Sequence, residues 1–141
     1  GTGIQHSEYN KNQDKSINLL QLWVMPNALN VSPRYDQKSI RELKKNNAFY
    51  QVLSPFTDDD GMWIHQEAWF HLGEFDKITE IEYQIKKNGN GIYVFVIEGS
   101  LTVVNQVLNK RDALGVWEVD KIFFVAQPDS KVLLVEVPMS F

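Results

Sequence analysis

A histidine and a carboxylate two positions apart, His6 and Glu8, are the residues at the start of the chain whose types and spacing fit metal chemistry. Residues i and i+2 of a strand point to the same face. On a strand, this pair would therefore direct an imidazole and a carboxylate at one ion. Catalytic metal sites use at least three protein ligands and leave one position open for water or substrate. The sequence thus predicts half of a coordination sphere, whose other ligands come from elsewhere in the chain or from other polypeptide.

The two other histidines lie in the run 63–72, which we expect to form one strand. Alternation places its apolar residues on one face, Ile64, Ala68, Phe70 and Leu72. The opposite face carries His65, Glu67, Trp69 and His71. Because the apolar face is the expected core face, these histidines are expected to be half-solvated or to face a partner. His65 and Glu67 repeat the His-x-Glu spacing, so a site built from both pairs across a dimer stays open as an alternative.

Composition excludes several classes of function. The chain has 141 residues, 43% of them hydrophobic, which is enough for one domain with its own core. A formal charge of -4 without a Lys/Arg-rich stripe argues against direct binding of nucleic acid. The absence of cysteine excludes disulfides, thiolate ligands and thiol nucleophiles. No apolar run is long enough to span a bilayer and no signal peptide is evident, so we expect a cytoplasmic protein without a membrane partner.

Short runs rich in branched and aromatic residues, separated by turn residues, predict about nine strands. They cover residues 19–25, 49–53, 63–72, 78–85, 92–97, 101–104, 114–119, 122–126 and 132–137. The Asn-Gly-Asn-Gly sequence at 88–91 tolerates positive φ and predicts a hairpin. Residues 39–42 have the form of a capping box, so one or two turns of helix are the alternative to a loop there. Evenly spaced strands favour an all-β fold of antiparallel strands, a sandwich or barrel of which the cupin jelly roll is one example.

Several of these segments resemble the pirin family, including its bacterial quercetinase-like members. Residues 3–10, 20–26 and 33–37 are similar to the middle of that family, and residues 64–68, 96–101 and 108–113 to its C-terminal cupin. The resemblance implies that residues 1–36 are a β extension remaining from an N-terminal cupin. It implies that residues 37–141 form a C-terminal cupin, a double-stranded β-helix barrel. In one place the chain departs from the family, because Arg111 replaces the glycine that commonly precedes the Asp-Ala pair. A turn that requires positive φ is costly for arginine.

The resemblance also implies a metal. Family members are bicupins of roughly twice this length, in which the N-terminal barrel binds one metal, usually iron, through an early His-x-His pair and a later His and Glu. By this resemblance His6 and Glu8 are the later pair, and the chain has no counterpart of the early pair. In quercetinase-like members such a divalent metal opens a flavonol ring with dioxygen. Eukaryotic pirins suggest instead a redox-sensitive module that binds transcriptional partners.

Three functions are therefore open. The preferred hypothesis is a pirin-like structural or binding module without a complete metal site of its own. The second is part of a metal-dependent, iron-type quercetin 2,3-dioxygenase-like enzyme whose site is completed by other polypeptide. The third is a cupin that binds a small molecule or a protein, with its cavity inside its own barrel. Because strands at 4–9 and 19–25 would lack partners, we expect them to mediate homo-oligomerisation or to fold back on their own cupin.

Overall fold

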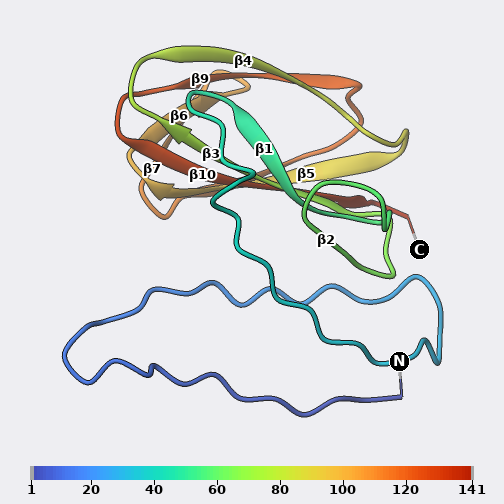
Figure 1. Cartoon of the computed structure of the whole chain (residues 1–141). Coiled ribbons are helices and arrows are strands. Elements are labelled where there is room, and N and C mark those ends of the chain that lie inside the picture. Colours follow the sequence, from blue (N-terminus) through green and yellow to red (C-terminus); the bar gives the residue numbers. More distant parts are fainter. Residues whose placement is uncertain (1, 141) are drawn as a thin grey trace.

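The computed structural model describes residues 2–140, which form two β-sheets and a long N-terminal segment, residues 2–45 (Figure 1). The strands are β1 (Phe49–Ser54), β2 (Met62–Trp63), β3 (Trp69–Phe75), β4 (Thr79–Gln84), β5 (Asn90–Glu98), β6 (Ser100–Val103), β7 (Gln106–Asn109), β8 (Ala113–Val116), β9 (Lys121–Ala126) and β10 (Ser130–Pro138). A six-stranded sheet has the order β2-β1-β3-β10-β5-β8, and a four-stranded sheet the order β4-β9-β6-β7. Adjacent strands are antiparallel except β1 and β2. The expected all-β architecture is confirmed.

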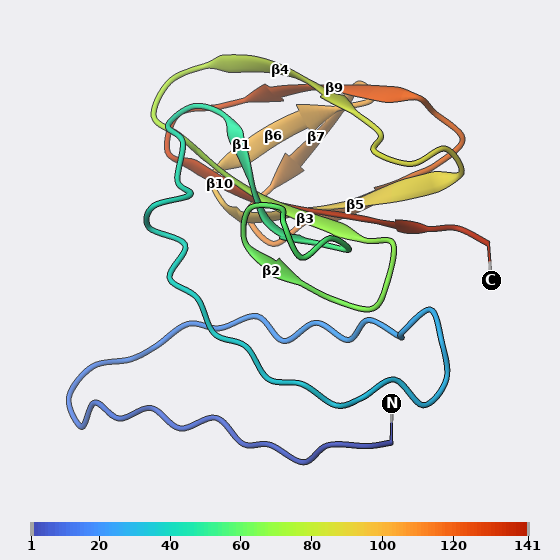
Figure 2. The same cartoon turned by 45° about the vertical axis from the view of Figure 1, so that its right-hand side comes forward.

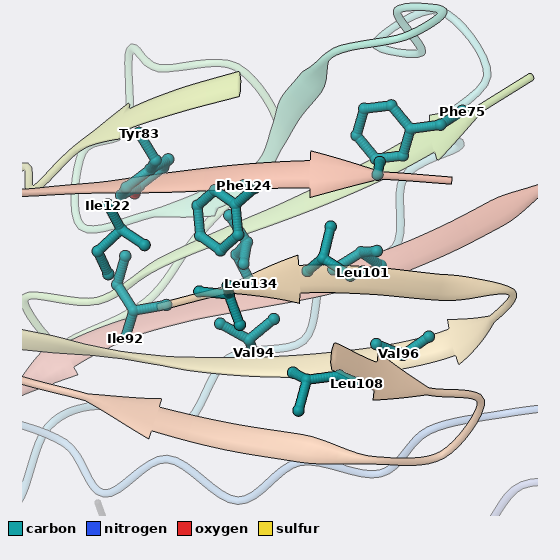
Figure 3. Packing of buried hydrophobic residues seen from close by; sticks show 13 residues of the cluster. Phe75, Tyr83, Ile92, Val94, Val96, Leu101, Leu108, Ile122, Phe124 and Leu134 are labelled. Carbon is teal, nitrogen blue, oxygen red and sulfur yellow. The ribbon is translucent and has the colours of Figure 1, made fainter. Parts of the chain in front are cut away.

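The main core lies between the two sheets, where alternate residues of each strand point inward (Figure 3). On β5 these are Ile92, Val94 and Val96, all at most 2% exposed. Phe124 of β9 is 1% exposed and meets the edge of the Phe49 ring, with centroids 5.5 Å apart. The interior of the barrel is therefore filled by its own side chains. The hypothesis of a binding cupin requires an open cavity in the same place.

The outer face of the six-stranded sheet is also apolar. A second cluster contains Tyr50, Phe70, Leu133 and Val135, each at most 8% exposed, and Val24 of the N-terminal segment packs against it. Because both faces of this sheet contact apolar layers, alternation along β3 does not separate a buried face from a solvated one.

The predicted strand 63–72 is consequently wrong in two respects. The structure divides it into β2, an irregular stretch at 64–68, and β3. His71, expected to be half-solvated, is 5% exposed and points into the barrel, where its ring packs against that of Tyr83. The reason is that Phe70 and Leu72 contact the outer apolar layer, which leaves the inner face to His71.

The N-terminal segment forms neither of the strands expected at 4–9 and 19–25, and the helix considered near 39–42 is a turn closed by a bond from Leu43 N–H to the Ile40 carbonyl (3.1 Å). Both views show the segment running along one side of the sheets without joining them (Figure 2). Strands form only where neighbouring backbone supplies hydrogen-bond partners, and no other part of residues 2–140 pairs with this segment as a strand. The division between residues 36 and 37 stays a prediction.

Two turns bear on the sequence predictions. The turn predicted at 88–91 is present, with Gly89 at φ 85°, but the expected hairpin is wrong. The turn connects β4 of the four-stranded sheet to β5 of the six-stranded sheet, and β4 pairs with β9 instead. Arg111 has φ 73°, and its N–H donates to the Val96 carbonyl at 2.7 Å. The turn before β8 thus keeps the left-handed conformation with arginine in the place where glycine was expected. Among residues 2–140 no helix has the length and apolar character needed to cross a membrane.

Candidate functional site

His6 and Glu8 contact each other directly on the N-terminal segment. Nε2 of His6 lies 3.0 Å from Oε1 of Glu8, and the two side chains are 54% and 55% exposed. Two ligands that each bind one divalent ion at about 2.1 Å, at about a right angle, are about 3 Å apart. The pair is therefore spaced to share an ion, although the same distance suits a direct hydrogen bond. Within residues 2–140 no group of three His, Cys, Asp or Glu side chains is placed to hold a metal.

The second His-x-Glu pair is engaged elsewhere. The His65 ring meets the Trp63 ring edge-on, with centroids 4.8 Å apart. The Glu67 carboxylate forms an ion pair with the ammonium group of Lys87. Since the two side chains have separate partners, the structure does not combine them with His6 and Glu8 into one set of ligands. A site formed across a dimer from both pairs stays a prediction.

The irregular stretch 64–68 receives the N-terminal segment. The His65 carbonyl accepts a hydrogen bond from Asn27 N–H (2.7 Å), and the Gln66 side chain donates to the Met25 carbonyl (2.9 Å). These bonds hold the N-terminal segment against the outer face of the six-stranded sheet, beside the second apolar cluster.

Arg34 joins the N-terminal segment to Trp63 of β2. Its Nη1 donates to the Trp63 carbonyl (2.6 Å), its Nη2 lies 3.1 Å from the Asp36 carboxylate, and its Cζ is 4.3 Å from the centre of the Trp63 ring. A planar guanidinium can make all three contacts at once, which a lysine cannot.

A cavity of about 360 Å³, which we call the seam cavity, lies between the N-terminal segment and the six-stranded sheet. Its lining is mostly apolar and includes Ile4, Val24 and Phe70, with Arg34 and His65 as polar members. Ile4 is two residues before His6, so the cavity adjoins the stretch that carries the metal-type pair. Its volume falls in the range of small-molecule sites, about 300–1,000 Å³.

Sequence reasoning missed a buried polar network around Glu136, which is 0% exposed. Its carboxylate accepts hydrogen bonds from the Tyr83 hydroxyl (2.8 Å), the Asn90 side-chain amide (2.8 Å) and the backbone N–H groups of Lys86 (3.0 Å) and Lys87 (3.1 Å). One carboxylate thus fixes the connection between β4 and β5. Glu136 is the one charged residue in the apolar run 132–137, and this was the available signal.

His71 completes this network, with Nδ1 3.4 Å from the Tyr83 hydroxyl oxygen. Burial, followed by the charge of Lys86, lowers the pKa of His71 to about 4, so the imidazole is neutral at neutral pH. Burial and the Glu136 carboxylate raise the pKa of Tyr83, which therefore keeps its proton. Because that proton is donated to Glu136, the contact with Tyr83 assigns the imidazole proton to Nδ1.

This arrangement of sheets agrees with known proteins. Residues 51–137 match the family model described as the quercetinase C-terminal cupin domain. The chain belongs to this family. It is 30% identical over 138 residues to quercetin 2,3-dioxygenase of Escherichia coli (strain K12), covering 98% of this chain and 58% of that protein. It is 40% identical over 140 residues to the putative quercetin 2,3-dioxygenase Mb0187c of Mycobacterium bovis, covering 97% of this chain and 56% of that protein.

The crystal structure of YhhW from Escherichia coli superimposes with a TM-score of 0.73 and 27% identity, over 82% of this chain and 48% of that one. A second structure shows the same bacterial pirin in complex with nickel(II). The cupin fold and the resemblance to pirins are thereby confirmed. The chain spans little more than half the length of the curated relatives it matches.

Proposed function

We propose that this chain is a quercetinase-like scaffold cupin that presents His6 and Glu8 as two ligands of a metal site shared with other polypeptide. The location of the donor groups carries this proposal. The metal-type pair lies on the N-terminal segment, outside the barrel, while the barrel interior is occupied by apolar side chains and the Glu136 network. The cupin domain would therefore position the segment, and the segment would supply the ligands.

The residues present fit a divalent metal only in part. His6 would bind through Nε2 as a neutral imidazole and Glu8 through Oε1 as a carboxylate, a donor set suited to iron or nickel. The metal would supply a Lewis acid with open positions for an enolate oxygen and dioxygen. The relatives named quercetin 2,3-dioxygenase and the nickel complex of YhhW support this assignment. The contribution of this chain is to hold the two ligands 3.0 Å apart beside the seam cavity.

A second candidate is a small-molecule site in the seam cavity, favoured by its volume and its apolar lining. A planar, largely apolar molecule would contact Val24 and Phe70 while a polar group reached the edge formed by Arg34. This role requires no metal, and it is distinguished from the first by ligand binding that persists in a His6→Ala variant.

We also expect the chain to associate through its N-terminal segment. Trp23, Met25 and Leu29 on this segment are 85%, 72% and 93% exposed. Apolar groups exposed in one stretch mark an interaction surface. Size-exclusion chromatography with light scattering measures the assembly, and a monomer that stays soluble at high concentration would contradict this expectation. A cytoplasmic location stays a prediction.

Metal titration tests the main proposal. Nickel(II) or iron(II) added to the isolated chain should bind weakly, and binding should be lost in His6→Ala and retained in His65→Ala. Calorimetry measures the affinity, and elemental analysis measures the metal that remains after dialysis. One tightly held ion per monomer, retained in the His6→Ala variant, would show that the ligands lie elsewhere and would overturn the scaffold assignment.

A further inference from the structure

A second hollow, which we call the end groove, lies where β5 begins and β10 ends. It has a volume of about 650 Å³ and is formed by the turn at 88–90, the stretch 117–120 that follows β8, and residues 139–140. In Figure 1 this is the end of the barrel near the C-terminus. None of its lining residues belongs to the N-terminal segment. The end groove is therefore separate from the His6–Glu8 pair and from the seam cavity.

The charged groups of the end groove are all acidic. Glu118 and Asp120 line it, no lysine or arginine does, and neither carboxylate forms an ion pair with another of residues 2–140. The backbone around them is held in place, since the Asp120 carbonyl accepts hydrogen bonds from Ile85 N–H (2.9 Å) and from the Gln84 side chain (2.9 Å). The groove thus offers negative charge on a positioned loop.

Asn90 adds a side-chain acceptor to the end groove. Its side chain belongs to a residue that is 3% exposed, and its Nδ2 donates to Oε1 of Glu136 at 2.8 Å. A carboxylate only accepts, so this bond fixes the amide orientation and directs Oδ1 away from Glu136. In the described part of the chain, every fully buried side-chain oxygen or nitrogen has a hydrogen-bond partner. Asn90 Oδ1 has no such partner there. Oδ1 is therefore not fully buried, and the hollow that Asn90 lines is the end groove.

Trp117 supplies an aromatic surface at the same place. The residue is 55% exposed, and its ring has no aromatic or cationic partner among residues 2–140. An indole face attracts cations, and a carboxylate or an amide oxygen accepts from an ammonium group. We propose that the end groove binds an organic ammonium ion, with its nitrogen donating to Asn90 Oδ1 and to Glu118 or Asp120, and its alkyl part against Trp117.

Nuclear magnetic resonance of the full chain tests this proposal with butylammonium chloride as the probe. The backbone amides of Gly89 and Asn90 should shift saturably, whereas sodium chloride at equal ionic strength should leave them unchanged. Trp117→Ala and Glu118→Gln should each weaken binding about fivefold, the equivalent of about 1 kcal/mol. Glu82→Gln removes an equal charge from the four-stranded sheet and should bind as the unaltered chain does.

Three outcomes would overturn the proposal. Equal shifts with sodium chloride would mean that the groove responds only to ionic strength. Equal or tighter binding of glucose or of magnesium at the same amides would assign the groove to a polyol or to a metal ion. Unchanged affinity in both Trp117→Ala and Glu118→Gln, with both variants folded by circular dichroism, would place the ammonium site elsewhere.

Discussion

Replacement of Glu136 by alanine tests whether one buried carboxylate stabilises the end of the barrel. The side chain is 0% exposed and accepts from the Tyr83 hydroxyl and the Asn90 amide as well as from two backbone N–H groups. In Glu136→Ala all four donors lose the Glu136 carboxylate as acceptor. The two backbone groups belong to Lys86 and Lys87, which are exposed residues, so water can replace the carboxylate there.

The side-chain donors of Tyr83 and Asn90 are less accessible to water, because these residues are 6% and 3% exposed, and the other acceptors near them, His71 Nδ1 and the Glu67 carbonyl, are each 3.4 Å away. Each buried donor left without an acceptor costs about 1–3 kcal/mol, and the space vacated by the side chain adds to this. We expect Glu136→Ala to lower the free energy of unfolding by about 3–5 kcal/mol. Tyr83→Phe leaves the carboxylate with its other donors, and should cost about 1–2 kcal/mol.

Urea denaturation followed by tryptophan fluorescence measures these differences, with the slope of each transition compared between variants. Glu82→Gln is the control, since it breaks an exposed pair with Lys121 and should change the free energy of unfolding by at most about 0.5 kcal/mol. A Glu136→Ala protein within about 1 kcal/mol of the unaltered chain, at an unchanged slope, would refute the reasoning.

Three further predictions concern single positions. Since the pKa of folded His71 is lowered to about 4, the unfolded chain binds a proton that the folded chain does not between about pH 6.5 and 4. The free energy of unfolding therefore falls as the pH falls through this window, and this loss should be roughly 3 kcal/mol smaller in His71→Gln than in the unaltered chain. Urea titrations at several pH values measure it, and parallel pH curves for the two proteins would contradict the prediction. Arg111→Gly removes a side chain from a residue at φ 73° and should raise the free energy of unfolding by about 0.5–1 kcal/mol, and with it the melting temperature. A lower melting temperature would mean that the arginine stabilises the turn. Gly99→Ala places Cβ 2.4 Å from the Ser130 hydroxyl oxygen, so it should lower the free energy of unfolding by about 2 kcal/mol or more. Gly89→Ala is the control, since no atom lies within 4 Å of its Cβ, and should cost about 1 kcal/mol. Equal losses in thermal denaturation would contradict the steric explanation.

Local sequence patterns predicted the strands of the barrel well, because alternation and turn residues act over a few positions. Runs at 49–53, 92–97, 122–126 and 132–137 lie within β1, β5, β9 and β10, and the Asn-Gly turn joins β4 to β5. β7 was not predicted, since its residues, Gln106–Asn109, include one apolar pair without alternation. The strands expected at 4–9 and 19–25 failed for another reason, since no part of residues 2–140 supplies them with a pairing strand.

Prediction of the functional site was likewise limited to contacts between residues close together in the sequence. The His-x-Glu spacing selected two side chains that touch, a contact that depends only on a short stretch of backbone, while their role as metal ligands stays a prediction. The role of Glu136 depends on donors 46 to 53 residues away along the chain, which no local pattern reports. Burial of His71 depends on an apolar layer outside the sheet, and therefore on which elements pack there.

The amino-acid sequence alone determined the family, the all-β class and most strand positions, because these follow from short-range alternation, turn residues and matching segments. Only the tertiary structure decided that both faces of the six-stranded sheet are covered, that His71 is neutral inside the barrel, and that Asn90, bonded to Glu136, lines the end groove. Burial, proton affinity and the direction of a side chain are set by atoms brought together from distant parts of the chain, and these contacts exist only once the chain has folded.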